Sequence, residues 1–196
     1  MAGEVPAYTM RAVLQAMQEV GGRQYASLVT QAGLSRFLQA LPADDPAIVA
    51  STAELSQLYG IVYNMLGEGA TRLLLRNYGT VVAQMGLQME WGHELAARAA
   101  EVPIEQRLAW LVPYLANFLG IAWAPHTASE DAKAWYLATA DCPICVEIRG
   151  AKAPLCANDE AIYGAIARKV MGRRVHVAEV ECLAMGQAHC KLAFYK

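Results

Sequence analysis

The chain has 196 residues, of which 56% are hydrophobic and 17% carry a formal charge. This composition suits a large core, and the length suits one domain or one and a half. The net charge is −2 and there is no basic cluster, so we do not expect nucleic acid as a direct partner. The N-terminus lacks a signal pattern, and five cysteines are an odd count that argues against a disulfide framework. We therefore expect a cytoplasmic protein.

The first part of the chain is predicted to be helical. Apolar residues recur at helical spacing across 8–20, and glycines end that pattern. Shorter helices are expected at 25–32 and 35–41. Ser51 and Glu54 then form a capping box, which marks the start of another helix.

Glycines interrupt the helices that follow. The sequence Gly-Glu-Gly at 67–69 is predicted to be a turn between two helices. Residues 70–100 continue as one long or broken helix that contains Gly79, Gly86 and Gly92. Glycines at such spacing permit close backbone packing, and this favours either a dimer interface or internal packing.

A strongly apolar helix is expected next, opening at Pro103. Residues 108–124 carry no charge, which brings this stretch to the short limit for a membrane span. Because it contains Pro113 and Asn117, we interpret it as a core helix that runs into a strand at 121–124.

The remainder of the chain is predicted to be rich in strands. We expect a polar turn at 125–131 and strands at 134–140, 146–148, 175–180 and 188–195. Helices followed by hairpins indicate an α+β fold, with N-terminal helices packed on an antiparallel sheet. We divide the chain into a helical region at 1–100 and a second region at 101–196, joined in one compact unit.

The stretch from Cys156 to Cys190 contains three of the five cysteines and one well-placed carboxylate, Glu179. Asn158 is predicted to cap a helix that Gly172 ends. Cys156 then lies near a helix N-terminus, an environment that favours the thiolate, the metal-binding form of cysteine.

The last two strands are predicted to form a hairpin in which Cys182 and Cys190 face each other. Glu179 and Cys182 are three residues apart, so a bulge between them is needed to bring them to one face. Together with Cys156 they make a four-coordinate set that suits zinc. The alternatives are a disulfide between Cys182 and Cys190, or cysteines that are simply buried hydrophobic residues.

This pattern resembles the 4-vinyl reductase domain family over roughly Trp135 to Phe194. The residues that carry the resemblance are Cys156, Glu179, Cys182, Gly186 and Cys190, preceded by Cys-Pro-Ile-Cys at 142–145. The family includes an accessory protein of bacteriochlorophyll synthesis. It also includes the sensor domains of phenol- and xylene-responsive transcription activators.

Resemblance to these sensors implies zinc at Cys156, Glu179, Cys182 and Cys190. It implies a fold like that of vesicle-tethering (TRAPP) subunits and nitric-oxide-signalling ligand-binding domains. It also implies a homodimer with an apolar ligand cavity, in which the helical region supplies the dimer contacts and one pocket wall.

The resemblance implies further that Trp135 lines the pocket and donates a hydrogen bond to the ligand. Filling the core is the alternative role for this residue. Tyr136, Trp110 and Tyr163 are additional wall candidates. The phenol sensors also use a histidine from an earlier helix, and here the only earlier histidines are His93 and His126.

Cys142 and Cys145 form a C-x-x-C pair, a pattern used for metal binding or redox chemistry. We expect both to lie outside the first shell, because the other four residues already complete a tetrahedral site. No Ser/His/Asp set, acid–base carboxylate pair or flavin fingerprint stands out, so no catalytic residue is assigned.

Three functions remain open. The first is a zinc-stabilised binding domain, a sensor or carrier, for an apolar, aromatic or tetrapyrrole-like molecule. The second is an accessory factor or enzyme of (bacterio)chlorophyll vinyl reduction, which would need a hydride or electron source. The third is a structural interaction subunit.

Overall fold

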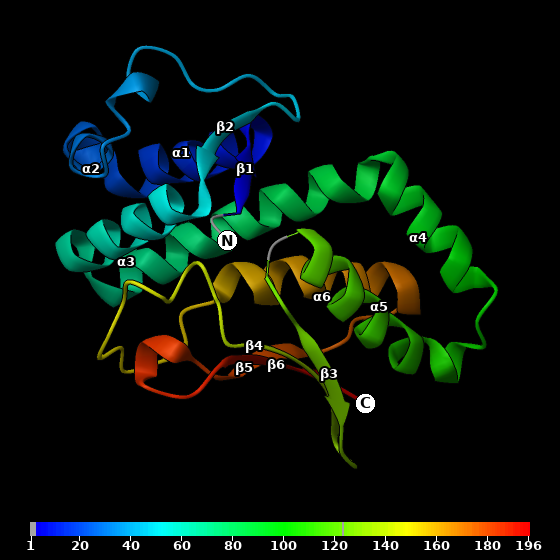
Figure 1. The fold of residues 1–196 in the computed structure, drawn as a ribbon. Helices are drawn as coiled ribbons and strands as arrows, with labels where there is room; N and C mark the ends of the chain where they lie inside the picture. The colour runs from blue at the N-terminus through cyan, green and yellow to red at the C-terminus, as the bar shows by residue number, and fades with distance from the viewer. Residues whose placement is uncertain (1–2, 123) are drawn as a thin grey trace.

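The computed structural model describes residues 3–122 and 124–196 and has an α+β fold, which confirms the predicted class (Figure 1). The helices are α1 (Ala7–Gly21), α2 (Tyr25–Gln31), α3 (Thr52–Gln88), α4 (Glu90–Ala100), α5 (Arg107–Ala122) and α6 (Ala157–Met171). Short 3-10 turns lie at Gly22–Gln24, Ser35–Phe37, Ile104–Gln106 and Leu183–Met185. The strands are β1 (Glu4–Pro6), β2 (Ile48–Ser51), β3 (Thr127–Glu130), β4 (Ala134–Thr139), β5 (Val177–Glu181) and β6 (Cys190–Tyr195).

The main sheet is antiparallel, in the order β3-β4-β6-β5. Leu137, Leu192 and Phe194 are buried in the core that this sheet forms with α5 and α6. The long helix α3 packs along α6, and α1 packs on α3 (Figure 1). Among the described residues, α5 and α6 are the helices with the most extensive contacts to the sheet, and α3 packs on α6.

Helix α3 begins as its sequence predicts. The Ser51 hydroxyl accepts the Glu54 N–H at 3.2 Å, and the Glu54 carboxylate accepts the Ser51 N–H at 2.8 Å. This capping box satisfies two backbone donors that the helix start would otherwise leave unpaired. The break expected at 67–69 is a kink inside α3, where Gly67 has a φ of 81°.

The glycines of α3 and α4 serve internal packing. A Cβ at Gly79 would lie 2.5 Å from the Asn158 Cα, so the backbones of α3 and α6 touch at this point. A Cβ at Gly92 would lie 2.6 Å from the Leu87 Cα. Nothing lies within 4 Å of a Cβ at Gly86. Of the two predicted alternatives, internal packing accounts for Gly79 and Gly92.

The structure corrects several predicted boundaries. The polar segment at 125–131 contains strand β3, whose pairing with β4 is a long-range contact that polarity does not reveal. Residues 146–147 lie in a turn and residue 148 has no regular structure, so the strand predicted at 146–148 is absent. Helix α5 continues through Ala122, so no strand begins at Ile121, and residue 123 of the predicted strand lies outside the described residues. Strands β1 and β2 are too short to show alternation and were not predicted.

The start of α6 also differs from the prediction. Cys156 is the N-cap, and Asn158 lies inside the first turn without capping it. The Asn158 side chain donates instead to the carboxylate of Asp159, at 2.7 Å. Gly172 ends the helix with a φ of 66°, as predicted. Over the described part of the chain, no helix combines the length and apolar character needed to cross a membrane.

Candidate ligand cavity and cysteine cluster

The fold brings all five cysteines together in the core, as free thiols. Cys142 and Cys145 come from the turns after β4, Cys156 caps α6, Cys182 follows β5 and Cys190 opens β6. The register shift predicted between Glu179 and Cys182 is present between Glu179 and Glu181. This irregularity allows the Glu179 carboxylate and the Cys182 thiol to approach the same cluster.

The sulfur atoms lie at the distances expected around one metal ion. Cys156 Sγ is 3.5 Å from Cys142 Sγ, 3.5 Å from Cys145 Sγ and 3.7 Å from Cys190 Sγ. Cys145 Sγ is also 3.5 Å from Cys182 Sγ. A tetrahedral zinc with Zn–S bonds of about 2.3 Å separates its sulfurs by about 3.8 Å.

Two overlapping sets of four donors have all their ligand atoms within 4.8 Å of one another. They are Cys142, Cys145, Cys156 and Cys190, and Cys145, Glu179, Cys182 and Cys190. The second set is the predicted one with Cys145 in the place of Cys156. Cys142 and Cys145, which we expected outside the first shell, therefore lie in the same cluster.

Glu179 is the one carboxylate of the cluster, and only 6% of the residue is exposed. Its Oε2 accepts the Cys156 N–H at 2.7 Å, whereas its Oε1 is buried without a partner. Burial, with the nearby Cys182 adding to it, raises the pKa of Glu179 to about 8. A buried carboxylate with an unused oxygen beside several thiols is a suitable metal ligand, so the cluster can hold a metal ion.

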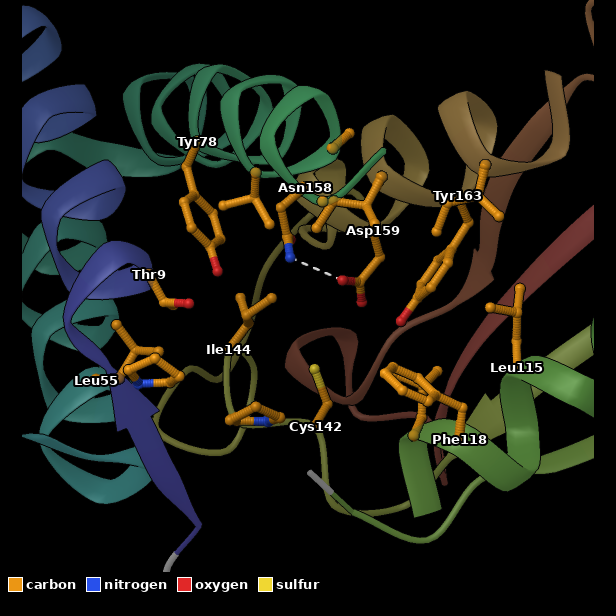
Figure 2. A pocket seen from close by; sticks show the side chains of 18 of the residues that line it. Thr9, Leu55, Tyr78, Leu115, Phe118, Cys142, Ile144, Asn158, Asp159 and Tyr163 are labelled. Atoms are coloured by element: carbon orange, nitrogen blue, oxygen red, sulfur yellow. Dashed lines mark hydrogen bonds between the residues drawn. The ribbon is translucent and has the colours of Figure 1, made fainter. Parts of the chain in front are cut away.

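A cavity of about 450 Å³ lies next to this cluster, between α1, α3, α5 and α6 (Figure 2). Its walls are largely apolar and include Leu55, Ile144 and Phe118. Cys142 belongs to both features, because its side chain lines the cavity while its sulfur contacts Cys156. The volume falls in the range of small-molecule sites in proteins.

Polar groups from α3 and α6 interrupt the apolar wall. Tyr59 Oη and Asn158 Oδ1 are buried without a hydrogen-bond partner. Figure 2 shows the Tyr78 and Tyr163 hydroxyls and the Asp159 carboxylate pointing into the cavity. Burial raises the pKa of Asp159 well above its usual range. Unpaired buried polar atoms are costly, so this end of the cavity is suited to a ligand with polar atoms.

A comparison with known protein families finds a match in the C-terminal region. Residues 135–195 match the model of the 4-vinyl reductase domain. The matched segment is similar to this domain. It contains all five cysteines, Glu179 and helix α6, and it agrees with the family that the cysteine pattern resembles. No curated protein matches the chain.

Solved structures also match the chain. One is the crystal structure of the phenol-responsive sensory domain of the transcription activator PoxR with phenol, at 18% identity and a TM-score of 0.46. The match covers 89% of this chain and 90% of that one.

The four residues predicted to line the cavity differ in their actual positions, and only some of them lie near it. Tyr163 lines the cavity. Trp135 lies on the helix-covered face of β4, but at the end of the strand away from the cavity. There it lines a separate surface depression with Leu108 and Met171. The β4 residue that lines the cavity is Thr139, which lies four residues after Trp135 and about 13 Å further along the strand. Strand periodicity fixes the face of a residue, but not which end of the sheet meets the cavity.

The other two aromatic residues also lie away from the cavity. Tyr136 is on the opposite face of β4 from Trp135, where its hydroxyl donates to Asp131 at 2.8 Å. Trp110 stacks on Tyr114, with ring centroids 5.2 Å apart. Of the two earlier histidines, His126 lines the cavity and His93 is exposed.

Proposed function

We propose that the protein is a zinc-stabilised binding domain, a sensor or carrier, which encloses an apolar small molecule. The observation that carries this proposal is the cavity itself: a volume of about 450 Å³ with apolar walls and unpaired buried polar atoms at one end. Apolar walls supply affinity, and a few converging polar groups supply orientation. Tyr163 is the predicted wall residue that the proposal retains.

The proposed metal ligands are Cys156, Glu179, Cys182 and Cys190, with zinc as the ion. The central position of Cys156, whose sulfur lies within 3.7 Å of three other sulfurs, supports its inclusion. The unpartnered Oε1 supports Glu179. Since Cys145 lies equally close to Cys156 and Cys182, at 3.5 Å, it is the rival for one position.

The metal would stabilise the fold rather than take part in chemistry. Four protein ligands leave no open position for water or substrate. The ion would fasten the start of α6 to the β5–β6 hairpin, and Asn158 and Asp159 stand in the first turn of that helix. Because an unfolded chain has no preformed site, metal binding contributes folding free energy. The metal would thus hold one wall of the cavity in place.

We also infer a homodimer. Leu73 and Val81 lie eight residues apart on α3, so they share one helix face, and they are 52% and 39% exposed. Apolar side chains repeated on one exposed face are typical of a contact surface. Sedimentation of Leu73→Glu beside the wild type would test this, because the variant should be monomeric where the wild type is dimeric.

Native mass spectrometry of protein purified without added ligand tests the proposed function. We expect one small molecule and about one zinc for each chain. A bound tetrapyrrole would point to vinyl reduction. A protein that carries no small molecule, and takes up none when offered, would contradict the proposal and favour a structural subunit.

A further inference from the structure

The polar end of the cavity has a definite electrostatic character. The described residues that line the cavity include no lysine or arginine, and their acids are Glu4 and Asp159. Glu4 is exposed, whereas Asp159 presents its carboxylate to the interior (Figure 2). His126 Nδ1 donates to the Ala124 carbonyl oxygen, 2.6 Å away, and burial lowers the pKa of this histidine. The described lining residues therefore offer no cationic side chain to pair with an anion.

Two groups at this end, the Asn158 amide oxygen and the Asp159 carboxylate, are hydrogen-bond acceptors. Asn158 is 4% exposed, and its amide nitrogen donates to Asp159 Oδ1 at 2.7 Å. That bond fixes the amide so that Asn158 Oδ1, an acceptor, remains buried without a partner. Asn158 and Asp159 are consecutive residues in the first turn of α6, so two acceptors converge on one small region.

Two neighbouring acceptors require two donors on the ligand. A primary amine or ammonium supplies two or three donors from one nitrogen, whereas a hydroxyl supplies one and a carboxylate supplies none. The hydroxyls of Tyr78 and Tyr163 point into the same cavity and can accept as well as donate, and Tyr59 also lines it. Aromatic rings around a cation add a favourable interaction of their own.

We propose that the cavity takes an apolar amine, whose nitrogen binds Asp159 and the Asn158 carbonyl oxygen while its hydrocarbon part fills the apolar walls. This inference rests on the proposed function and names the ligand class for the same cavity. In this arrangement the ligand ammonium pairs with the Asp159 carboxylate, and the Asn158 carbonyl oxygen accepts a second N–H from the same nitrogen.

Three ligands of nearly equal size, 2-phenylethylamine, 2-phenylethanol and phenylacetate, test the proposal. They compete with the neutral naphthalene dye prodan for the wild-type protein. A charge-assisted hydrogen bond is about twice as strong as a neutral one. We expect the amine to bind at least about tenfold tighter than the alcohol, which corresponds to about 1.4 kcal/mol. Phenylacetate should bind most weakly.

The variant Asp159→Asn keeps the shape of the side chain and removes its charge. It should bring the affinities of the amine and the alcohol to within about threefold of each other, and prodan binding measured in parallel reports whether the cavity is still formed. Asp44→Asn, on an exposed segment, is the matched control and should keep the amine preference. The wild-type series needs no variant, so it remains decisive if Asp159→Asn does not fold.

The outcomes separate this proposal from the proposed function. If prodan binds but the wild type does not prefer the amine, or if Asp159→Asn keeps the preference, the amine proposal is overturned and the cavity proposal stands. If neither prodan nor any of the three ligands binds the wild type, the proposed function fails as well.

Discussion

Replacement of Gly79 by alanine should force α3 and α6 apart where they cross. The new Cβ would lie 2.5 Å from both the Cα and the carbonyl oxygen of Asn158. Carbon atoms in contact are normally about 3.5–4.0 Å apart, so the helices must separate by about 1 Å. The obstructing atoms belong to the backbone of α6 and cannot rotate away. The strain therefore has to be taken up by displacement of the helix that carries Asn158 and Asp159.

The cost follows from this geometry. Overpacking of a well-packed core lowers the free energy of unfolding by about 1–3 kcal/mol. We expect a loss near the upper end of this range, because the new Cβ meets backbone atoms of α6 that cannot change rotamer. In a chain of this length, 1 kcal/mol lowers the melting temperature by about 2–4 °C, so a loss of about 3 kcal/mol corresponds to about 6–12 °C. Prodan affinity should fall too, because the polar end of the cavity moves with α6.

Thermal unfolding followed by circular dichroism, at a fixed zinc concentration, measures the effect. Gly164→Ala is the matched control, since a Cβ at Gly164 in α6 meets nothing within 4 Å. The control should be as stable as the wild type or more stable by up to about 1 kcal/mol, because alanine favours helix. If Gly79→Ala had the same melting temperature as the wild type, the close crossing of α3 and α6 would be refuted.

Three further changes test separate parts of the structure. Cys190 is one of the four proposed zinc ligands, so Cys190→Ser should abolish zinc binding in a metal assay and lower the melting temperature. Of two more serine variants, Cys156→Ser should lose zinc and Cys145→Ser should keep it; the reverse result would show that Cys145 is the ligand. Trp135→Ala should lower stability by removing core contacts yet leave prodan uptake unchanged, and weakened uptake would contradict its placement outside the cavity. Ser51→Ala should cost about 1 kcal/mol in chemical denaturation, and no loss would mean that the capping box is not formed.

Local signals in the sequence were sufficient for most of the secondary structure. Ser51 and Glu54 marked the start of α3, and Gly172 marked the end of α6. The strand that opens at Cys190 and the bulge after Glu179 also followed from spacing. These features depend on residues within a few positions of one another, so a single sequence reveals them. Strand β3 depends on pairing with β4, and local composition conceals it.

The candidate site was predictable only in part. The grouping of Cys156 with Cys182 and Cys190 was predicted from spacing together with the family resemblance. Neither showed that the sulfurs of Cys142 and Cys145 lie 3.5 Å from the Cys156 sulfur. Asn158 and Asp159 were missed as cavity residues because the same residue types are common at helix starts. Their role depends on the close approach of α3, which brings the tyrosines of another segment to the same place.

The central claim is that the cavity encloses a small apolar molecule, and a prodan titration of wild type and Ala83→Phe tests it most directly. Ala83 is buried in the cavity wall on α3, so a phenyl ring there would occupy the space that a ligand needs. The account predicts one saturable site per chain in the wild type and an affinity at least about tenfold weaker in Ala83→Phe, about 1.4 kcal/mol, with zinc content unchanged. Equal affinity in a folded, zinc-loaded Ala83→Phe protein, or no saturable binding by the wild type, would contradict it.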